Sequence, residues 1–404
     1  MNTPRFPRRR LLACMGGLGV AVLAAACGEG GPESTPSGGA AGGDVAEAPM
    51  GDAGEILIFS NSSPHVTAID ILTEEISRTG DVDGLAAWAW NDDNNFFDGR
   101  HLWLGTLNPS GGTAELITLD VDSLSVANRI PLGSEAEGVF LGKARQDGSL
   151  LVSKMAAGEV LTVNTATQEV TNTFSDVPLH GGVLADADLS IDAEGVERFV
   201  YPTGEGDRVV ALDPSSGSVL ATAESKKGGN PTRLTTSPDG SIWVQESGKH
   251  TVAVYEPSAL ELVKRLQTGT EPILGTFTYD GSYAYTGHAD DNFVQVVDTA
   301  KLRALAHIRV GLNPQMVAVR PDFSRIYAML TDDQAVAVVY QQDWEANSST
   351  ITSTKENSIA LESAPVGMFL RMTSVGGRLR DSAERAEACR ISYACGTQNL
   401  GTKR

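Results

Sequence analysis

The chain has 404 residues, 41% of them hydrophobic, and carries a formal net charge of −20 at pH 7. Binding of a nucleic-acid backbone needs a basic stripe, so this acidic balance excludes nucleic acid as a partner and leaves cations, basic partners or simple solubility. The 43 glycines and the 6% aromatic content predict many turns and a thin, repetitive core.

Residues 1–26 have the order of an export signal. In "RFPRRRLLACMGGLGVAVLAAAC", arginines precede an apolar run over 11–26 that is short for a membrane-spanning helix and typical of a signal peptide. Arg8 and Arg9, followed after one residue by two leucines, resemble a twin-arginine export signal. Cleavage would remove four arginines and make the mature chain four charges more negative.

The "LAAAC" that ends in Cys27 resembles a bacterial lipobox, in which the cysteine thiol takes a diacylglyceryl group. Leu23 stands one place further from the cysteine than usual, and ordinary signal cleavage with an incidental Cys27 is the alternative. Residues 27–54 are rich in Gly, Ser, Pro and Ala and are predicted to be a disordered tether. We therefore predict an exported lipoprotein, anchored through Cys27 to the outer side of the bacterial cytoplasmic membrane or to the cell surface.

Residues 55–372 repeat one plan of short strands and turns. Seven segments have the pattern of an innermost strand: "GLAAWAW" (84–90), "EGVFLG" (137–142), "HGGVLAD" (180–186), "NPTRLTTS" (230–237), "EPILGTF" (271–277), "NPQMVAV" (313–319) and "APVGMFL" (364–370). The prolines of the last four recur about every 40–50 residues, a period typical of four-stranded propeller blades.

Turn residues recur within each repeat. Asp-Gly, which admits the positive φ of a tight hairpin, leads into the second strand at Asp98, Asp147, Asp239 and Asp280. A short acceptor that can bond backbone N–H groups two residues on ends the third strand at Asp70, Asp120, Asn164, Asp213, Glu256 and Asp298.

The two ends of the repeat region complement each other. Residue 55 begins a second-strand pattern, whereas 364–371 have an innermost-strand pattern with no second strand after them. The last strand is therefore predicted to pair with the first, which would close the ring and leave no free sheet edge there. Seven innermost strands predict an all-β, seven-bladed β-propeller.

These units resemble the YVTN-type β-propeller repeat. The matching segments are Pro238-Asp239-Gly240, "VQVVDTAK" and "DPSSGSVLAT". The resemblance implies the propeller architecture. It does not choose a function, because the family includes uncharacterised surface proteins, lactonase-like enzymes and heme- or copper-associated relatives.

Residues 373–404 form a charged tail that contains "CRISYAC". Outside the cytoplasm, Cys389 and Cys395 are predicted to form a disulfide, with two free thiols as the alternative. A metal site is less favoured, because no histidine or further cysteine lies nearby in the sequence.

Loops before the innermost strands and turns between the second and third strands of a blade emerge on one face. This places six carboxylates and four of the six histidines on one rim: His65, His180, His250, His288, Glu205, Asp207, Asp290, Asp291, Asp332 and Asp333. Such a set could bind a divalent cation or a polar ligand. The alternative is that these are solvated residues suited to turns.

The catalytic signatures H-E-x-x-H, G-x-S-x-G and C-x-x-C and the Walker loop are missing from the sequence. We therefore predict a membrane-anchored binding or scaffold module, without a cofactor, that meets an unknown protein or small polar ligand through the rim loops. The alternative is a propeller enzyme or cofactor carrier, either a lactonase-like metal-dependent hydrolase or a heme- or copper-linked redox protein.

Overall fold

The computed structural model describes residues 53–61, 63–83, 96–106, 113–135, 139–154, 158–184, 186–278, 280–320, 324–340, 351–352 and 358–372. The predicted leader, the lipid site Cys27, the tail with Cys389 and Cys395, and the segment "GLAAWAW" lie outside these residues. None of the helical segments in the described part has the length and apolarity that a membrane crossing requires.

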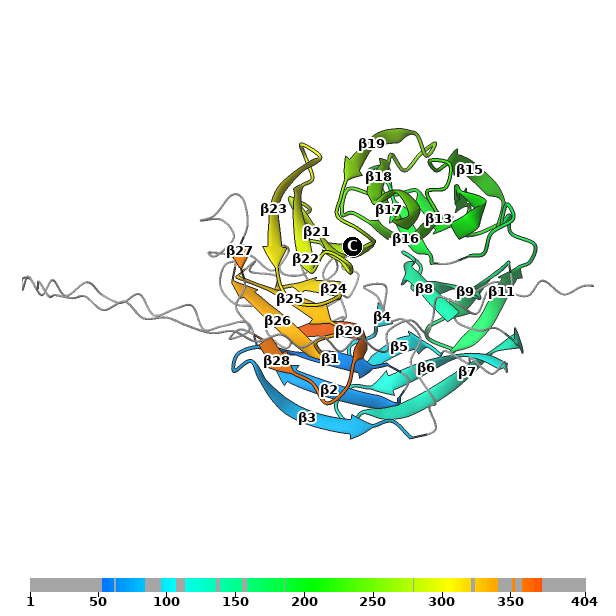
Figure 1. The fold of residues 1–404 in the computed structure, drawn as a ribbon. Helices are drawn as coiled ribbons and strands as arrows, with labels where there is room; N and C mark the ends of the chain where they lie inside the picture. The colour runs from blue at the N-terminus through cyan, green and yellow to red at the C-terminus, as the bar shows by residue number, and fades with distance from the viewer. Residues whose placement is uncertain are drawn as a thin grey trace, which may run out of the picture. The chain divides into compact units, whose positions relative to one another are not determined.

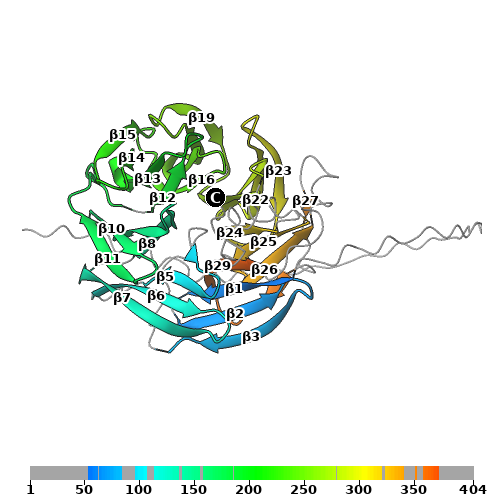
Figure 2. The same cartoon turned by 180° about the vertical axis from the view of Figure 1, so that it is seen from behind.

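Seven sheets stand around a common centre (Figures 1 and 2). From the innermost to the outermost strand, blade 1 consists of β29 (Pro365–Met372), β1 (Gly54–Ser60), β2 (His65–Asp70) and β3 (Glu75–Asp81). In the same order, blade 2 consists of β4 (Phe96–Phe97), β5 (His101–Gly105), β6 (Thr113–Asp120) and β7 (Ser125–Glu135), and blade 3 of β8 (Val139–Ala144), β9 (Ser149–Lys154), β10 (Glu159–Asn164) and β11 (Glu169–Phe174).

Blades 4 to 7 have the same order. Blade 4 consists of β12 (Asp188–Ile191), β13 (Glu197–Pro202), β14 (Arg208–Leu212) and β15 (Val219–Glu224), and blade 5 of β16 (Pro231–Thr236), β17 (Ile242–Glu246), β18 (Thr251–Tyr255) and β19 (Leu262–Gln267). Blade 6 consists of β20 (Pro272–Phe277), β21 (Tyr283–His288), β22 (Phe293–Asp298), β23 (Arg303–Arg309) and the added β27 (Ile351–Thr352). Blade 7 consists of β24 (Pro314–Val319), β25 (Arg325–Leu330), β26 (Ala335–Tyr340) and β28 (Ser358–Ala360). The predicted seven-bladed, all-β propeller is confirmed.

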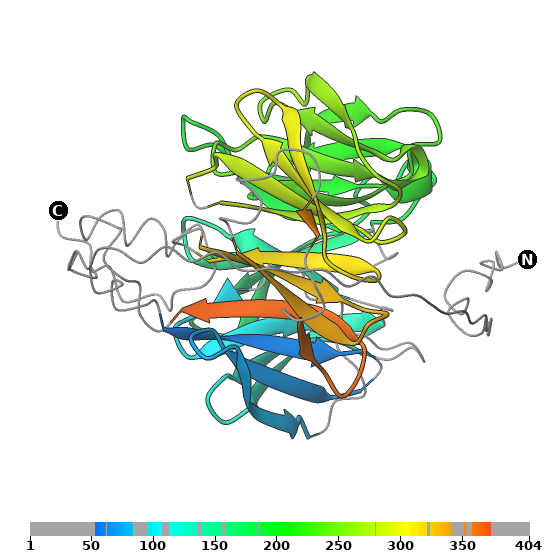
Figure 3. The same cartoon turned by 60° about the vertical axis from the view of Figure 1, so that its left-hand side comes forward.

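Ring closure is also confirmed. β29 pairs with β1 in antiparallel register from Gly54 opposite Met372 to Ser60 opposite Pro365, and the two strands lie side by side in Figure 3. The backbone N–H of Asn61 extends the pairing by donating to Ala364 O at 2.7 Å. The last strand therefore completes the first blade, as the pattern at the two ends of the repeat predicts.

Acidic side chains close the hairpins as their spacing predicts. Asp70 Oδ1 accepts the backbone N–H groups of Leu72 at 2.8 Å and Thr73 at 2.9 Å. Gly240 follows Asp239 with a φ of 86°, in the left-handed region that glycine favours, and a Cβ there would lie 2.3 Å from the carbonyl oxygen of Ile191. Each of these turns is thus fixed within one hairpin or against its direct neighbour.

One innermost strand was predicted in the wrong place. The segment from His180 does not form the innermost strand of blade 4, which is β12 instead. His180 and Gly181 have φ values of 48° and 83°, so the backbone turns rather than extends. A Cβ on Gly182 would lie 1.7 Å from Thr203 O, which shows how closely this turn packs on the next one.

The hydrophobic core lies between neighbouring blades. Trp103 of blade 2 is fully buried and packs with Leu141 and Val152 of blade 3. Phe369 of β29 lies with its ring centroid 5.6 Å from that of Phe97 and joins blade 1 to blade 2. Each blade is thus stabilised mainly by burial against its two neighbours.

Candidate functional site

Because the four strands of a blade alternate in direction, its loops divide between two faces. We call the face with the loops before the innermost strands and the turns between second and third strands the rim face. The opposite face, with the turns between first and second and between third and fourth strands, is called the turn face. All the candidate histidines and acids belong to loops or strand ends of the rim face.

His65 begins β2 and binds carboxylates. Its Nδ1 lies 2.8 Å from Asp81 Oδ1, and its Nε2 lies 3.9 Å from Glu362 Oε2 in the loop before β29. The His65 imidazole therefore lies between the end of β3 and the loop before β29.

His180 and His250 both have positive φ. The φ of His180 is 48°, close to the 46° of Asn230 and the 55° of Asn313 in the loops before later innermost strands. His250 has a φ of 56°, and its Nδ1 accepts the backbone N–H of Glu271 at 3.3 Å. Asn and His are enriched among residues that tolerate this conformation, so both positions have a structural explanation.

His288 is the most unusual of the candidates. Its side chain is fully buried, and neither ring nitrogen has a hydrogen-bond partner among the described residues. Burial lowers the pKa of His288 to about 4, although the negative charge of Asp291 acts in the opposite direction. Its ring centroid lies 4.7 Å from that of Phe293, which in turn stacks on His307 at 4.5 Å. His288 is therefore a neutral residue at neutral pH.

Side chains of the rim turns hold the loops between blades from both sides. In the loop between blades 6 and 7, Leu312 N donates to Asp333 Oδ2 at 2.8 Å and Asn313 N donates to Asn292 Oδ1 at 3.3 Å. The loop between blades 5 and 6 follows the same plan, since Thr270 N donates to Asp291 and Glu271 N to His250.

Asp207 and Asp332 also bond groups in the loops between blades. Asp207 accepts the backbone N–H groups of Gly228 at 2.7 Å and Asn230 at 2.9 Å, and Asp332 accepts the side-chain amide of Asn313 at 3.1 Å. Glu205 and Asp290 are exposed. Within the described ranges, no three His, Cys, Asp or Glu side chains come together as a metal site.

A polar network inside the ring joins three blades and was not predicted. Lys143 of β8 donates through Nζ to Asp188 Oδ2 at 2.9 Å and to Thr236 O at 3.0 Å. The same Asp188 oxygen accepts the backbone N–H of Thr236 at 2.9 Å, and the Asp188 side chain is fully buried. These residues belong to the innermost strands of blades 3, 4 and 5, and no spacing in the sequence brings them together.

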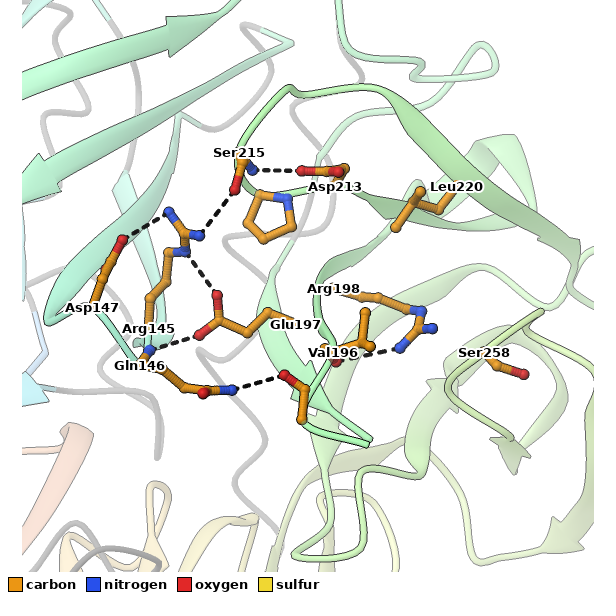
Figure 4. Close-up of a pocket in the computed structure, with 12 residues that line it drawn as sticks. Arg145, Gln146, Asp147, Val196, Glu197, Arg198, Asp213, Ser215, Leu220 and Ser258 are labelled. Atoms are coloured by element: carbon orange, nitrogen blue, oxygen red, sulfur yellow. Dashed lines mark hydrogen bonds and ion pairs between the residues drawn. The ribbon is translucent and has the colours of Figure 1, made fainter. Parts of the chain in front are cut away.

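A cleft of about 530 Å³ lies on the turn face among blades 3, 4 and 5. Arg145 crosses it, with Nε 3.0 Å from Glu197 Oε2 and Nη2 3.1 Å from Ser215 Oγ (Figure 4). The remaining lining residues are Gln146, Asp147, Gly195, Val196, Arg198, Asp213, Pro214, Leu220 and Ser258. Sequence reasoning missed this cleft, because it combines the turns of three separate blades.

The cleft is lined by charged side chains and by a few apolar ones. Arg198 is buried, and its Nη1 donates to Asp192 at 2.6 Å and to Val196 O at 3.3 Å. Val196 and Leu220 are 46% and 47% exposed, so the opening carries apolar surface beside the ion pairs.

No protein-family model matches the chain, and no curated protein sequence matches it significantly. Solved structures do match. A periplasmic gluconolactonase from Pseudomonas aeruginosa is 16% identical with a TM-score of 0.61, and the match covers 80% of this chain and 99% of that one. A Bacteroides fragilis protein provisionally named 6-phosphogluconolactonase is 12% identical with a TM-score of 0.60, covering 80% and 98%.

The hydrazine synthase of Kuenenia stuttgartiensis is 16% identical with a TM-score of 0.54, and the match covers 75% of this chain and 99% of that one. At such low identities these likenesses show the fold alone. The chain is thus a seven-bladed propeller whose structural neighbours include 6-phosphogluconolactonase-like propellers.

Proposed function

We propose that the chain is an exported, lipid-anchored propeller that binds a protein or a small polar ligand through the loops of its rim face. Export and anchoring rest on the twin-arginine pattern at Arg8 and Arg9 and on the lipobox-like segment before Cys27. The binding role rests on the rim.

The observation that supports binding best is the way the rim loops are fixed. Side chains such as Asp207 and Asp333 hold the loops between blades by backbone hydrogen bonds. The exposed carboxylates of Glu205, Asp290 and Asp332 therefore stand on loops with little freedom to lose when a partner binds. Their charge favours a cation or a basic protein surface as the partner.

Photo-crosslinking in cells tests the rim. A crosslinking residue at Glu205 or Asp332 should give a discrete adduct, whereas the same residue at Asp239 or Asp280, which are exposed on the turn face, should not. Calcium titration of the matured protein by calorimetry tests the cation, with Asp290→Asn as the variant. Absence of both adduct and calcium binding would contradict the proposal.

Palmitate labelling tests the anchor separately. The chain should incorporate radiolabelled palmitate and the Cys27→Ser chain should not. Equal labelling of both chains, or none of either, would remove lipidation at Cys27 from the proposal.

A lactonase-like hydrolase is the second candidate, because the structural neighbours include a gluconolactonase that covers most of the fold. Turnover of gluconolactone above its spontaneous hydrolysis would favour it. Metal analysis of the purified, export-matured protein separates the cofactor-free module from a metal-dependent hydrolase, and a visible absorption spectrum separates both candidates from a heme- or copper-linked redox carrier. A stoichiometric metal or chromophore that is lost in His180→Ala would overturn the cofactor-free binding module.

A further inference from the structure

Both ends of the propeller segment lie on the turn face. β1 begins at Gly54, which pairs with Met372 at the end of β29. Gly54 O also accepts the backbone N–H of Ile71 at 3.2 Å, and Ile71 lies in the turn between the third and fourth strands of blade 1. The chain that leads to Cys27 therefore joins the propeller on the face opposite the rim.

The same face carries nearly all of the exposed large apolar side chains in the described part of the chain. Seven of the eight, each at least 40% exposed, belong to its turns or to the strand ends beside them. Five of these gather on the adjacent blades 4 and 5: Val196, Val219, Leu220, Leu262 and Val263. Leu72 and Ile76 of blade 1 are the other two.

The rim face differs in this respect. Leu312 is its only member of that set in the described part, at 48% exposed, whereas carboxylates such as Glu205 and Asp290 are exposed there. Single exposed apolar residues are normal on a soluble surface. The concentration of exposed apolar side chains on the face where the predicted tether joins the propeller calls for an explanation.

We infer that the turn face rests on the lipid bilayer and that Leu262, Val263 and their neighbours on blade 4 enter its interfacial region. This inference rests on the proposed lipid anchor. A Gly- and Ser-rich segment over 27–53 would span about 30 Å on average, so an anchored propeller stays close enough for weak apolar contacts to act. The rim face would then point away from the membrane.

The charge of the turn face indicates which lipid headgroups it can contact. Its hairpins are closed by carboxylates, among them Asp70, Asp147, Asp239 and Asp280. Arg100 and Lys301 are exposed on the same face, where they pair with Asp120 and Asp298, and the whole chain carries a net charge of −20. An anionic bilayer would repel this face. We therefore expect contact with zwitterionic phosphatidylcholine or phosphatidylethanolamine surfaces and weaker contact when phosphatidylglycerol is added.

Hydrogen exchange on the lipidated full-length chain in phosphatidylcholine vesicles tests the inference, with the Cys27→Ser chain as the unanchored reference. Peptides over 192–196 and 256–263 should exchange several-fold more slowly on vesicles. Rim peptides over 203–207 and 247–250 should exchange at equal rates in both samples.

Paired variants make the test specific. The double variant Leu262→Ser/Val263→Ser should lose the slowing over 256–263 while it still incorporates palmitate. Leu312→Ser, an equally exposed position on the rim, should leave the slowing intact. Absence of palmitate overturns the anchor and with it this inference. Palmitate incorporation with slowing on the rim, or with none on either face, overturns the inference alone.

Discussion

Aspartates on the two faces of the propeller accept backbone hydrogen bonds over very different sequence separations. On the turn face, Asp70 bonds backbone groups two and three residues on, within its own hairpin. On the rim face, Asp207 and Asp333 bond backbone groups 21 residues away, in the loops between blades. Asp207 and Asp333 therefore hold blade to blade, whereas Asp70 shapes one hairpin. Substitutions on the two faces should differ in size accordingly.

Glu246, at the rim end of β17, should show the largest effect. Its carboxylate is fully buried, and accepts Arg265 Nε at 3.0 Å, Thr251 Oγ1 at 2.7 Å and Ser225 Oγ at 2.7 Å. Burial acts to raise the pKa of Glu246, but these hydrogen bonds outweigh it and lower the pKa. Glu246→Ala leaves Arg265 without its partner and should cost about 3–5 kcal/mol of unfolding free energy in urea.

Glu246→Gln is the matched control for that measurement. It keeps the shape and part of the hydrogen bonding, so it should cost less than Glu246→Ala. A loss below about 1 kcal/mol for the alanine variant would show that this buried network contributes little to the stability of the propeller.

His288 should make the rim sensitive to acid. Its folded pKa of about 4 lies below the usual histidine value of 6.5, so the unfolded chain takes up a proton that the folded chain resists. The loss of unfolding free energy due to His288 is absent above pH 6.5, grows as the pH falls, and is complete below about pH 4. At that point it amounts to roughly 3 kcal/mol.

Urea unfolding of the chain and of His288→Gln at pH 7 and pH 4 isolates this effect. Other groups titrate equally in both proteins, so the variant should lose less stability between the two pH values. An equal loss in both proteins would mean that His288 does not stay neutral in the fold.

Asp207→Ala should show an intermediate effect, about 2 kcal/mol. It removes the acceptor of two backbone N–H groups and places alanine at a φ of 50°. Asp207→Asn, which tolerates this backbone and keeps an acceptor, should recover most of the loss in the same urea measurement. An asparagine variant as unstable as the alanine variant would assign the effect to charge alone.

Asp70→Ala should show the smallest effect of the series, about 1 kcal/mol or less. It removes bonds within one exposed hairpin, and water can replace the lost acceptor. The urea midpoint should shift slightly with an unchanged slope. A loss of stability equal to that of Asp207→Ala would show that hydrogen bonds to the loops between blades matter no more than those within one hairpin.

Local chemistry explains what could be predicted from the sequence. Asp239-Gly240 and the acid at Asp70 act within a few residues, so their turns were predicted correctly. The apolar pattern at 364–371 with no second strand after it was enough to place β29 beside β1. The proline period located the innermost strands of blades 5 to 7.

Contacts between blades explain what could not be predicted. The burial of His288 is an exception, because Phe293 and Asp291 belong to its own hairpin; its position at the rim alone does not show this burial. Lys143, Asp188 and Thr236 meet across three blades. The strand predicted from His180 was wrong because His180 and Gly181 turn the backbone before β12 begins.

The completion of blade 1 by β29 also sets an order of events in the cell. β1, β2 and β3 are made early, yet their inner partner is among the last parts of the propeller to leave the ribosome. At about 5–20 residues per second, roughly 300 intervening residues take tens of seconds to synthesise. Through that interval the newborn first sheet has an open inner edge, and a route that transports chains only after they have finished folding would suit such a molecule.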